Sequence, residues 1–163
     1  MSDINKFLSP LFLKDKEIRK LMELLFFSYR DFTVGPDNIL EKINFSRTHH
    51  RIIYFTGKKK KITIKELINI LQIPKQNLSR VLNQLVKKKY INMEIGSDKR
   101  TKNLILTKKG LELERKLSDI QIKKIRGILK NAENDDINGF KKILFLMIDS
   151  KGKETFNKLN YEK

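Results

Sequence analysis

Cysteine is absent from all 163 residues of the chain. This absence excludes disulfides, thiolate nucleophiles, cysteine redox switches and cysteine-based zinc sites, and it suits a reducing compartment. Residues 1–5 show no basic stretch leading into an apolar run and a small-residue cleavage site, and no segment approaches ~18 uncharged apolar residues. We therefore expect a cytoplasmic protein that is neither secreted nor inserted in a membrane.

Catalytic patterns are also lacking: there is no nucleophile elbow, no glycine-rich phosphate loop and no recognisable pair of carboxylates. The two histidines, His49 and His50, are adjacent. On a helix they point about 100° apart, which is unsuited to joint metal binding, and no third soft ligand exists. We therefore predict that the protein is not an enzyme and that it binds no cofactor and no metal. Polar packing between domains is the favoured role of the histidines, with pH sensing or effector binding as alternatives.

Positive charge is what the chain has in excess. Its 36 Lys and Arg residues against 19 Asp and Glu residues give a net charge of +17. Nucleic acid is the first expected partner of such a chain. Anionic membrane surfaces, acidic proteins or a merely solvated lysine surface are the alternatives.

Helical periodicity is strong near the start of the chain. From residue 16 to residue 32 apolar side chains follow one helix face and then widen it: Ile18, Leu21, Met22, Leu24, Leu25, Phe26, Phe27, Tyr29 and Phe32. A helix that is apolar around so much of its circumference is expected to pack against a second subunit. We expect Gly35 and Pro36 to end it, and Asp37 to begin a short helix through Ile43.

Two more helices are expected toward the end of the chain. Thr107 is a helix cap by type, and the pattern after it predicts a long helix to about Lys130. Residues 136–149 predict a helix that is apolar at its centre but too short to span a bilayer. We expect the dimerisation helices in segments 15–44 and 108–150, and a loosely attached tail over 152–163.

Three shorter helices are expected in the middle of the chain. The first covers 46–55. The second covers 63–71, because Thr63 and Glu66 have the spacing of a capping box. The third covers 75–88 and follows Pro74, a residue suited to a helix entrance. Its apolar face is formed by Leu78, Val81, Leu82 and Leu85. Two short helices joined by a turn of about three residues form a helix-turn-helix.

A β-hairpin is expected directly after these helices. Ile91, Met93 and Ile95 alternate with polar residues, which is typical of a half-buried strand, and a second strand is expected over 103–106. Turn-forming and basic residues lie between them, over 96–102. Such a hairpin is the wing of a winged helix-turn-helix.

The polar face of helix 75–88 carries the side chains expected to contact DNA. These are Lys75, Gln76, Asn77, Ser79, Arg80, Asn83 and Lys87, with Gln84 on the same face. Gln and Asn pair with adenine and Arg with guanine, whereas Lys and Ser hold phosphates. Gln76, Asn77 and Arg80 lie in the half of the helix that usually reaches base edges, so we assign specificity to them. An ordinary solvated helix face is the alternative.

The wing tip supplies a second set of predicted DNA contacts. Arg100 suits the minor groove, and Lys99 and Lys102 suit phosphates. Asp98 is expected to fix the loop by accepting hydrogen bonds. Arg51 is assigned a phosphate contact. The alternative for the wing is a charged turn that serves only solubility.

Several of these motifs resemble one known family. Residues 98–100, 104–107 and Gly110 are similar to the wing and following helix of MarR-family transcriptional regulators, and 48–55 and 75–82 resemble an alphaproteobacterial-type branch. The resemblance covers about 16–150. It implies a triangular dimer with two winged lobes on a palindromic site, and small anionic or phenolic ligands bound between the dimerisation helices and the lobe. Pro74 departs from the serine or threonine cap of many members.

The sequence thus predicts a single unit over 1–163, mostly α with a small β-hairpin wing. It is a winged helix-turn-helix over 46–107 with N- and C-terminal dimerisation helices. The predicted function is a homodimeric transcriptional regulator, by default a repressor, that binds double-stranded DNA at a pseudopalindromic operator with half-sites ~10 base pairs apart. A basic protein that coats the nucleoid or RNA, and a protein-interaction scaffold, are the alternatives.

Overall fold

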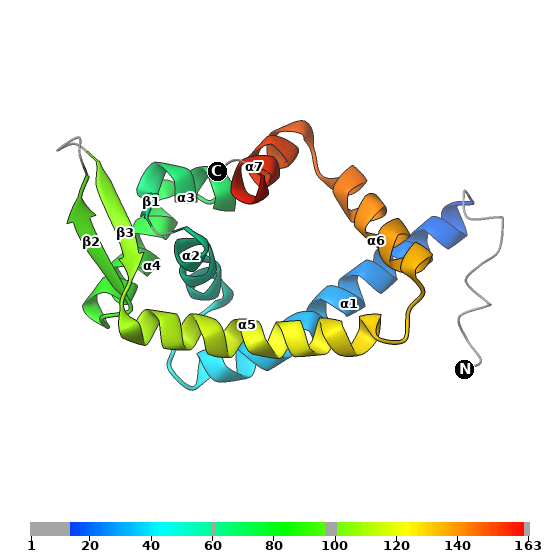
Figure 1. Cartoon of the computed structure of the whole chain (residues 1–163), viewed down its shortest axis with the longest axis horizontal. Coiled ribbons are helices and arrows are strands. Elements are labelled where there is room, and N and C mark those ends of the chain that lie inside the picture. The colour runs from blue at the N-terminus through cyan, green and yellow to red at the C-terminus, as the bar shows by residue number, and fades with distance from the viewer. Residues whose placement is uncertain (1–13, 60, 97–100, 162–163) are drawn as a thin grey trace.

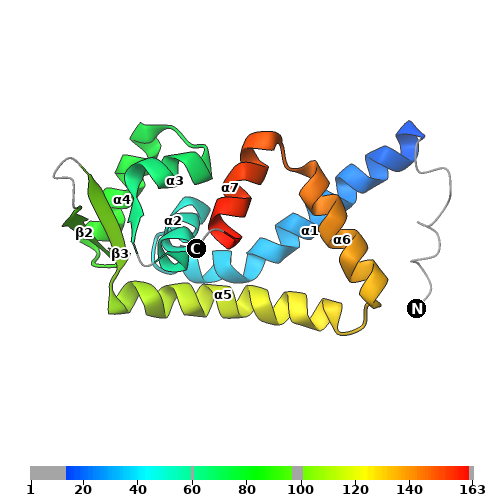
Figure 2. The same cartoon turned by 45° about the horizontal axis from the view of Figure 1, so that its top comes forward.

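The computed structural model describes residues 14–59, 61–96 and 101–161. The described elements follow the order α1 (Asp15–Glu41), α2 (Arg47–Lys58), β1 (Ile62–Thr63), α3 (Ile64–Leu71), α4 (Lys75–Lys87), β2 (Ile91–Ile95), β3 (Lys102–Leu106), α5 (Lys108–Leu129), α6 (Asn134–Met147) and α7 (Ser150–Asn160). The sheet lies at one end of α5 and α6 at the other (Figures 1 and 2). The predicted fold class, mostly helical with a small wing, is confirmed.

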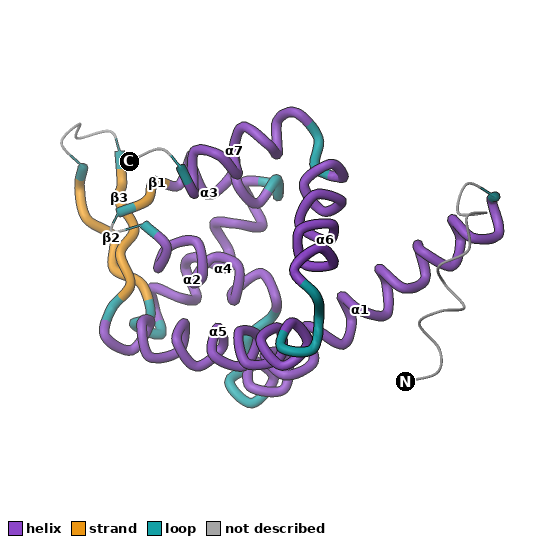
Figure 3. Tube along the Cα trace, turned by 45° about the vertical axis from the view of Figure 1, so that its right-hand side comes forward, coloured by secondary structure: helices purple, strands orange, loops and turns teal. Residues whose placement is uncertain are grey.

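Helix α1 is longer than the sequence predicts. It runs without a break from Asp15 to Glu41 with Pro36 inside it, so the expected end at Gly35 and Pro36 and the separate short helix are wrong. The reason is packing. Pro36 is fully buried, and Gly35 faces Ile120 of α5 so closely that any side chain would collide. Burial at this helix crossing offsets the backbone hydrogen bond that proline cannot donate. The other end of α1 projects from the body (Figure 3).

The helix-turn-helix forms as predicted. In the capping box, Glu66 N donates to Thr63 Oγ1 at 3.2 Å and Thr63 N donates to Glu66 Oε2 at 2.7 Å. Ile62 and Leu67, on either side of this helix start, are fully buried. Helix α2 continues to Lys58, three residues beyond the predicted end at Phe55. The main core is formed by α2, α3, α4 and the sheet, with Leu40 of α1 and Leu113 and Leu117 of α5.

The sheet contains one strand more than predicted. Its antiparallel order is β1-β3-β2, and Ile62 of β1 pairs with Leu104. The expected half-buried alternation of β2 is wrong: Ile91 is buried, but Met93 is 40% and Ile95 75% exposed. Only the base of the hairpin covers the core, since the strands project beyond the helices toward the wing tip (Figure 1).

Residues 150–160 form helix α7, which overlaps the segment 152–163 for which the sequence predicts a loosely attached tail. Helix α7 begins with Asp149, whose carboxylate accepts from Gly152 N at 2.6 Å. It reaches α2 and α3 through Lys58 Nζ to Asn160 Oδ1 at 2.7 Å and Lys151 Nζ to Gln72 Oε1 at 3.3 Å. An aspartate cap and these tertiary contacts order residues whose composition alone suggests fraying.

Candidate nucleic-acid interface

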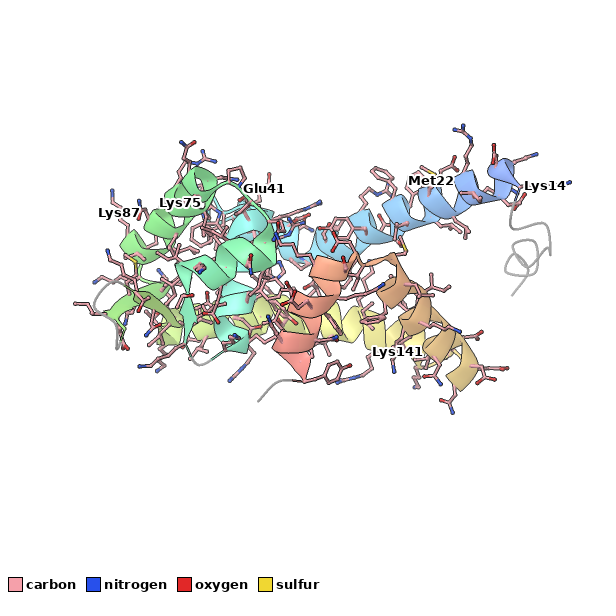
Figure 4. All side chains as sticks on the ribbon, turned by 90° about the horizontal axis from the view of Figure 1, so that it is seen from above. Lys14, Met22, Glu41, Lys75, Lys87 and Lys141 are labelled. Atoms are coloured by element: carbon pink, nitrogen blue, oxygen red, sulfur yellow. The ribbon has the colours of Figure 1, made fainter. Side chains whose placement is uncertain are left out.

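Helix α4 presents its polar face outward because its apolar face is buried. Leu78, Val81, Leu82 and Leu85 are buried in the core. Five predicted contact residues are exposed and two are half-buried: Lys75, Gln76, Arg80, Asn83 and Lys87, then Asn77 and Ser79. Lys75 and Lys87 lie at the outer edge of the molecule (Figure 4). The sequence of α4 contains no acidic residue, so nothing on this helix repels a phosphate backbone.

Two of the predicted reading residues contact each other. Arg80 Nη2 donates to Asn77 Oδ1 at 3.3 Å, one helical turn apart. The helix itself starts well without a capping hydroxyl, because Leu78 N donates to Pro74 O at 3.1 Å. The departure at Pro74 therefore leaves the start of α4 intact.

His49 connects α2 to the outer part of α4. Ser46 N donates to His49 Nδ1 at 3.0 Å, and His49 Nε2 lies 2.7 Å from Gln84 Oε1. The imidazole stacks on Phe45 with 4.3 Å between ring centroids. Burial lowers the pKa of His49, and the nearby cations Lys88 and Arg80 lower it further. Sequence reasoning left Gln84 out of the assigned contacts, since the only signal was its place on the polar face.

The wing is described only up to its tip. Gly96 N donates to Thr101 O at 2.9 Å and closes the ladder between β2 and β3. Lys102 is exposed at the start of β3. The other predicted wing contacts, Asp98, Lys99 and Arg100, lie outside the described residues.

Arg51 lies on a different surface from the α4 residues. Its Nη2 donates to the Tyr29 hydroxyl of α1 at 2.8 Å, and its side chain lines a cavity that contains no residue of α4. The structure thus brings the α4 residues together and does not bring Arg51 to them. The phosphate contact assigned to Arg51 stays a prediction.

This cavity of about 1030 Å³ lies between α1, α2 and α5. Apolar and aromatic side chains form much of its wall: Tyr29, Phe32, Tyr54, Phe55, Ile122, Ile125 and Leu129. Three cations line it as well, Arg51, Arg126 and Lys130, together with Arg47, which is ion-paired with Asp37 across 2.6 Å; the wall has no Asp or Glu among the described residues. The site therefore suits a ligand with an apolar body and a negative charge. Of the residues in this wall, the sequence predicts a phosphate contact for Arg51 and offers effector binding as one alternative for His50, and it places Tyr29 and Phe32 on the apolar face of the first helix.

The described part of the chain carries neither a metal-binding cluster nor a membrane-spanning helix. No three His, Asp or Glu side chains there are grouped to hold a metal ion. No helix there is long and apolar enough to cross a membrane.

Known proteins resemble this chain along most of its length. A MarR family profile matches residues 43–100. The HTH-type transcriptional regulator PetP of Rhodobacter capsulatus is 40% identical over 140 residues, which cover 85% of this chain and 84% of PetP.

Solved structures share the fold at lower identity. Streptococcus pneumoniae FabT in complex with DNA superposes with a TM-score of 0.71 at 22% identity, over 80% of this chain and 94% of that one. A MarR protein from Peptoclostridium difficile superposes with a TM-score of 0.69 at 21% identity, over 89% of this chain and 94% of that one.

Proposed function

This chain belongs to the MarR family of transcriptional regulators, and on that basis we propose that it is a homodimeric repressor that binds a pseudopalindromic operator through α4 and the wing. The family consists of regulators rather than enzymes. The observation that carries the proposal is the outward face of α4, which is amide-rich, cationic and free of acidic residues, directly before a basic hairpin.

Unpartnered apolar surface supports the dimer. The first half of α1 exposes large side chains such as Phe26, which is 63% exposed, and α6 has no buried residue although its centre is apolar. Apolar surface this extensive is rare on a monomer and is expected to be covered by a second copy. The two recognition helices would then be held at a fixed separation on one duplex.

The cavity supports control by a small molecule. We assign to it an aromatic or aliphatic carboxylate, or a phenolate, because cations and apolar groups converge there. Its wall includes α2, and α2 contacts α4 through His49 and Gln84. A ligand that shifts α2 would therefore shift the recognition helix and alter DNA affinity.

The proposal is tested by recovering bound fragments from the genome of origin and titrating the selected site at fixed salt. The recovered site should be pseudopalindromic and preferred over unrelated duplex and structured RNA by roughly a thousandfold. Arg80→Ala should weaken binding to the recovered site by roughly 1 to 3 kcal/mol and relax selectivity at one base pair. Lys87→Ala is the matched variant at a predicted phosphate contact, and it should weaken binding to all duplexes by the same factor. Equal binding to every nucleic acid would favour the coating protein instead.

A further inference from the structure

The protonation of His49 follows from a backbone donor. Ser46 N lies 3.0 Å from His49 Nδ1, and a peptide nitrogen always donates, so Nδ1 is the acceptor and carries no proton. Ser46 Oγ lies 3.0 Å from the same nitrogen. The ring is only 5% exposed and stacks on Phe45. The imidazole is therefore neutral, with its proton on Nε2.

That proton decides which way the Gln84 amide faces. Nε2–H donates to Gln84 Oε1 across 2.7 Å, because only the oxygen of an amide can accept. The oxygen is thus held toward α2. Gln84 is exposed, so its NH₂ group is the end left toward solvent.

We infer that His49 is a positioning residue that makes Gln84 a further DNA-contacting residue, which presents its two N–H donors to the duplex while its amide oxygen is held toward α2. The inference rests on the proposed role of α4. Its partner must be an acceptor: a phosphate oxygen, or a base edge such as O6 and N7 of guanine or O4 of thymine. Bidentate pairing with adenine needs both ends of the amide and is disfavoured here.

The surroundings of Gln84 suit such an acceptor. Arg80 precedes it and Lys88 follows it by four residues, so both cations flank the amide on the helix surface. Lys88 Nζ also lies 4.6 Å from the centroid of the Phe45 ring, against which His49 stacks. A negatively charged group near the amide would be stabilised from both sides.

The first test is ¹⁵N NMR of the imidazole in the free, full-length protein at pH 7. We expect the signal of an unprotonated nitrogen at Nδ1 of His49 and of a protonated nitrogen at Nε2. A proton on Nδ1, in the other tautomer or in the imidazolium form, overturns the inference. This result does not depend on DNA binding. A wild-type chain that binds no duplex at low salt would overturn the proposed function and leave the NMR result standing.

The second test is a double-mutant cycle on the selected operator. Gln84→Met keeps the length of the side chain but removes the donors, and it should weaken binding roughly 5- to 30-fold, the effect of one hydrogen bond to a charged or polar acceptor. His49→Asn keeps an acceptor near Ser46 N and loses the donor to Gln84. His49→Asn alone should weaken binding to the operator, and it should cause no further loss of affinity when it is combined with Gln84→Met.

Two outcomes overturn the inference in this second test: Gln84→Met binding like the wild type, or His49→Asn acting equally in both backgrounds. Asn157→Met, an exposed amide on α7, is the matched control and should bind normally. The pattern of loss identifies the acceptor. A loss of affinity that is equal for the operator and for unrelated duplex indicates a phosphate. A loss of affinity that depends on the identity of one operator base pair indicates a base edge. Because Gln84 is exposed, its variants should fold.

Discussion

Gly35 of α1 and Ile120 of α5 are packed so closely that a Cβ built on Gly35 would lie 2.5 Å from Ile120 Cγ2. The glycine is therefore required by a helix crossing and does not end a helix. This contact is one point at which the long N-terminal helix packs closely against α5.

Gly35→Ala should destabilise the protein by about 1 to 2 kcal/mol, because overpacking outweighs the better helix propensity of alanine. Urea unfolding of the purified chain measures the change. Gly127→Ala is the matched control on α5: nothing lies within 4 Å of its Cβ, so it should be neutral or stabilising by up to ~1 kcal/mol. Equal stability of both variants would contradict the close crossing.

Acid should destabilise the fold through its histidines. Burial lowers the pKa of both His49 and His50. Below pH ~6.5 the unfolded chain therefore binds more protons than the folded chain, and the free energy of unfolding decreases until the pH falls below the folded pKa values. His49→Asn removes one of the two groups, so its loss of stability between pH 7.5 and 5.0, measured by urea unfolding, should be smaller. A loss as large as that of the wild type would show that His49 does not contribute.

Benzoate, used as a probe, should bind the cavity better than its neutral analogue benzamide, because the wall carries cations and no described carboxylate. A ligand at 100 times its Kd raises the free energy of unfolding by about 2.7 kcal/mol, which a thermal shift detects. Arg51→Met should reduce the shift, and Arg115→Met, on α5 outside the cavity wall, should leave it unchanged. Shifts of equal size with both compounds would count against an anion site.

Leu146→Glu should weaken the dimer, since Leu146 is 60% exposed in the single chain and would be covered by a second copy. The substitution removes one buried leucine from each of the two subunits, at about 2 kcal/mol each, so the cost is about 4 kcal/mol, or ~1000-fold in the dimer dissociation constant, before the added charges are counted. Sedimentation equilibrium measures this constant. Lys141→Glu, an exposed charged position on the same helix, is the control. A monomeric wild type, or an unchanged constant in Leu146→Glu, would argue against α6 as an interface.

Local patterns account for the parts of the fold that the sequence predicts well. Thr63 and Glu66 satisfy each other's backbone groups within one turn, so the start of α3 is determined by four neighbouring residues. The apolar face of α4 follows from spacing alone, and its polar face follows by exclusion. The predicted α4 contacts could be assigned for this reason.

The sequence by itself determined the helix-turn-helix and the hairpin, because each depends on residues close together in the chain. It also determined the excess of cations, which is a matter of composition. Tertiary structure alone decided the continuity of α1 through Pro36, the two-residue strand β1, the cavity wall and the bond from His49 to Gln84. Those features join residues far apart in the chain, and their free energy comes from burial and hydrogen bonds that exist only after the helices have packed.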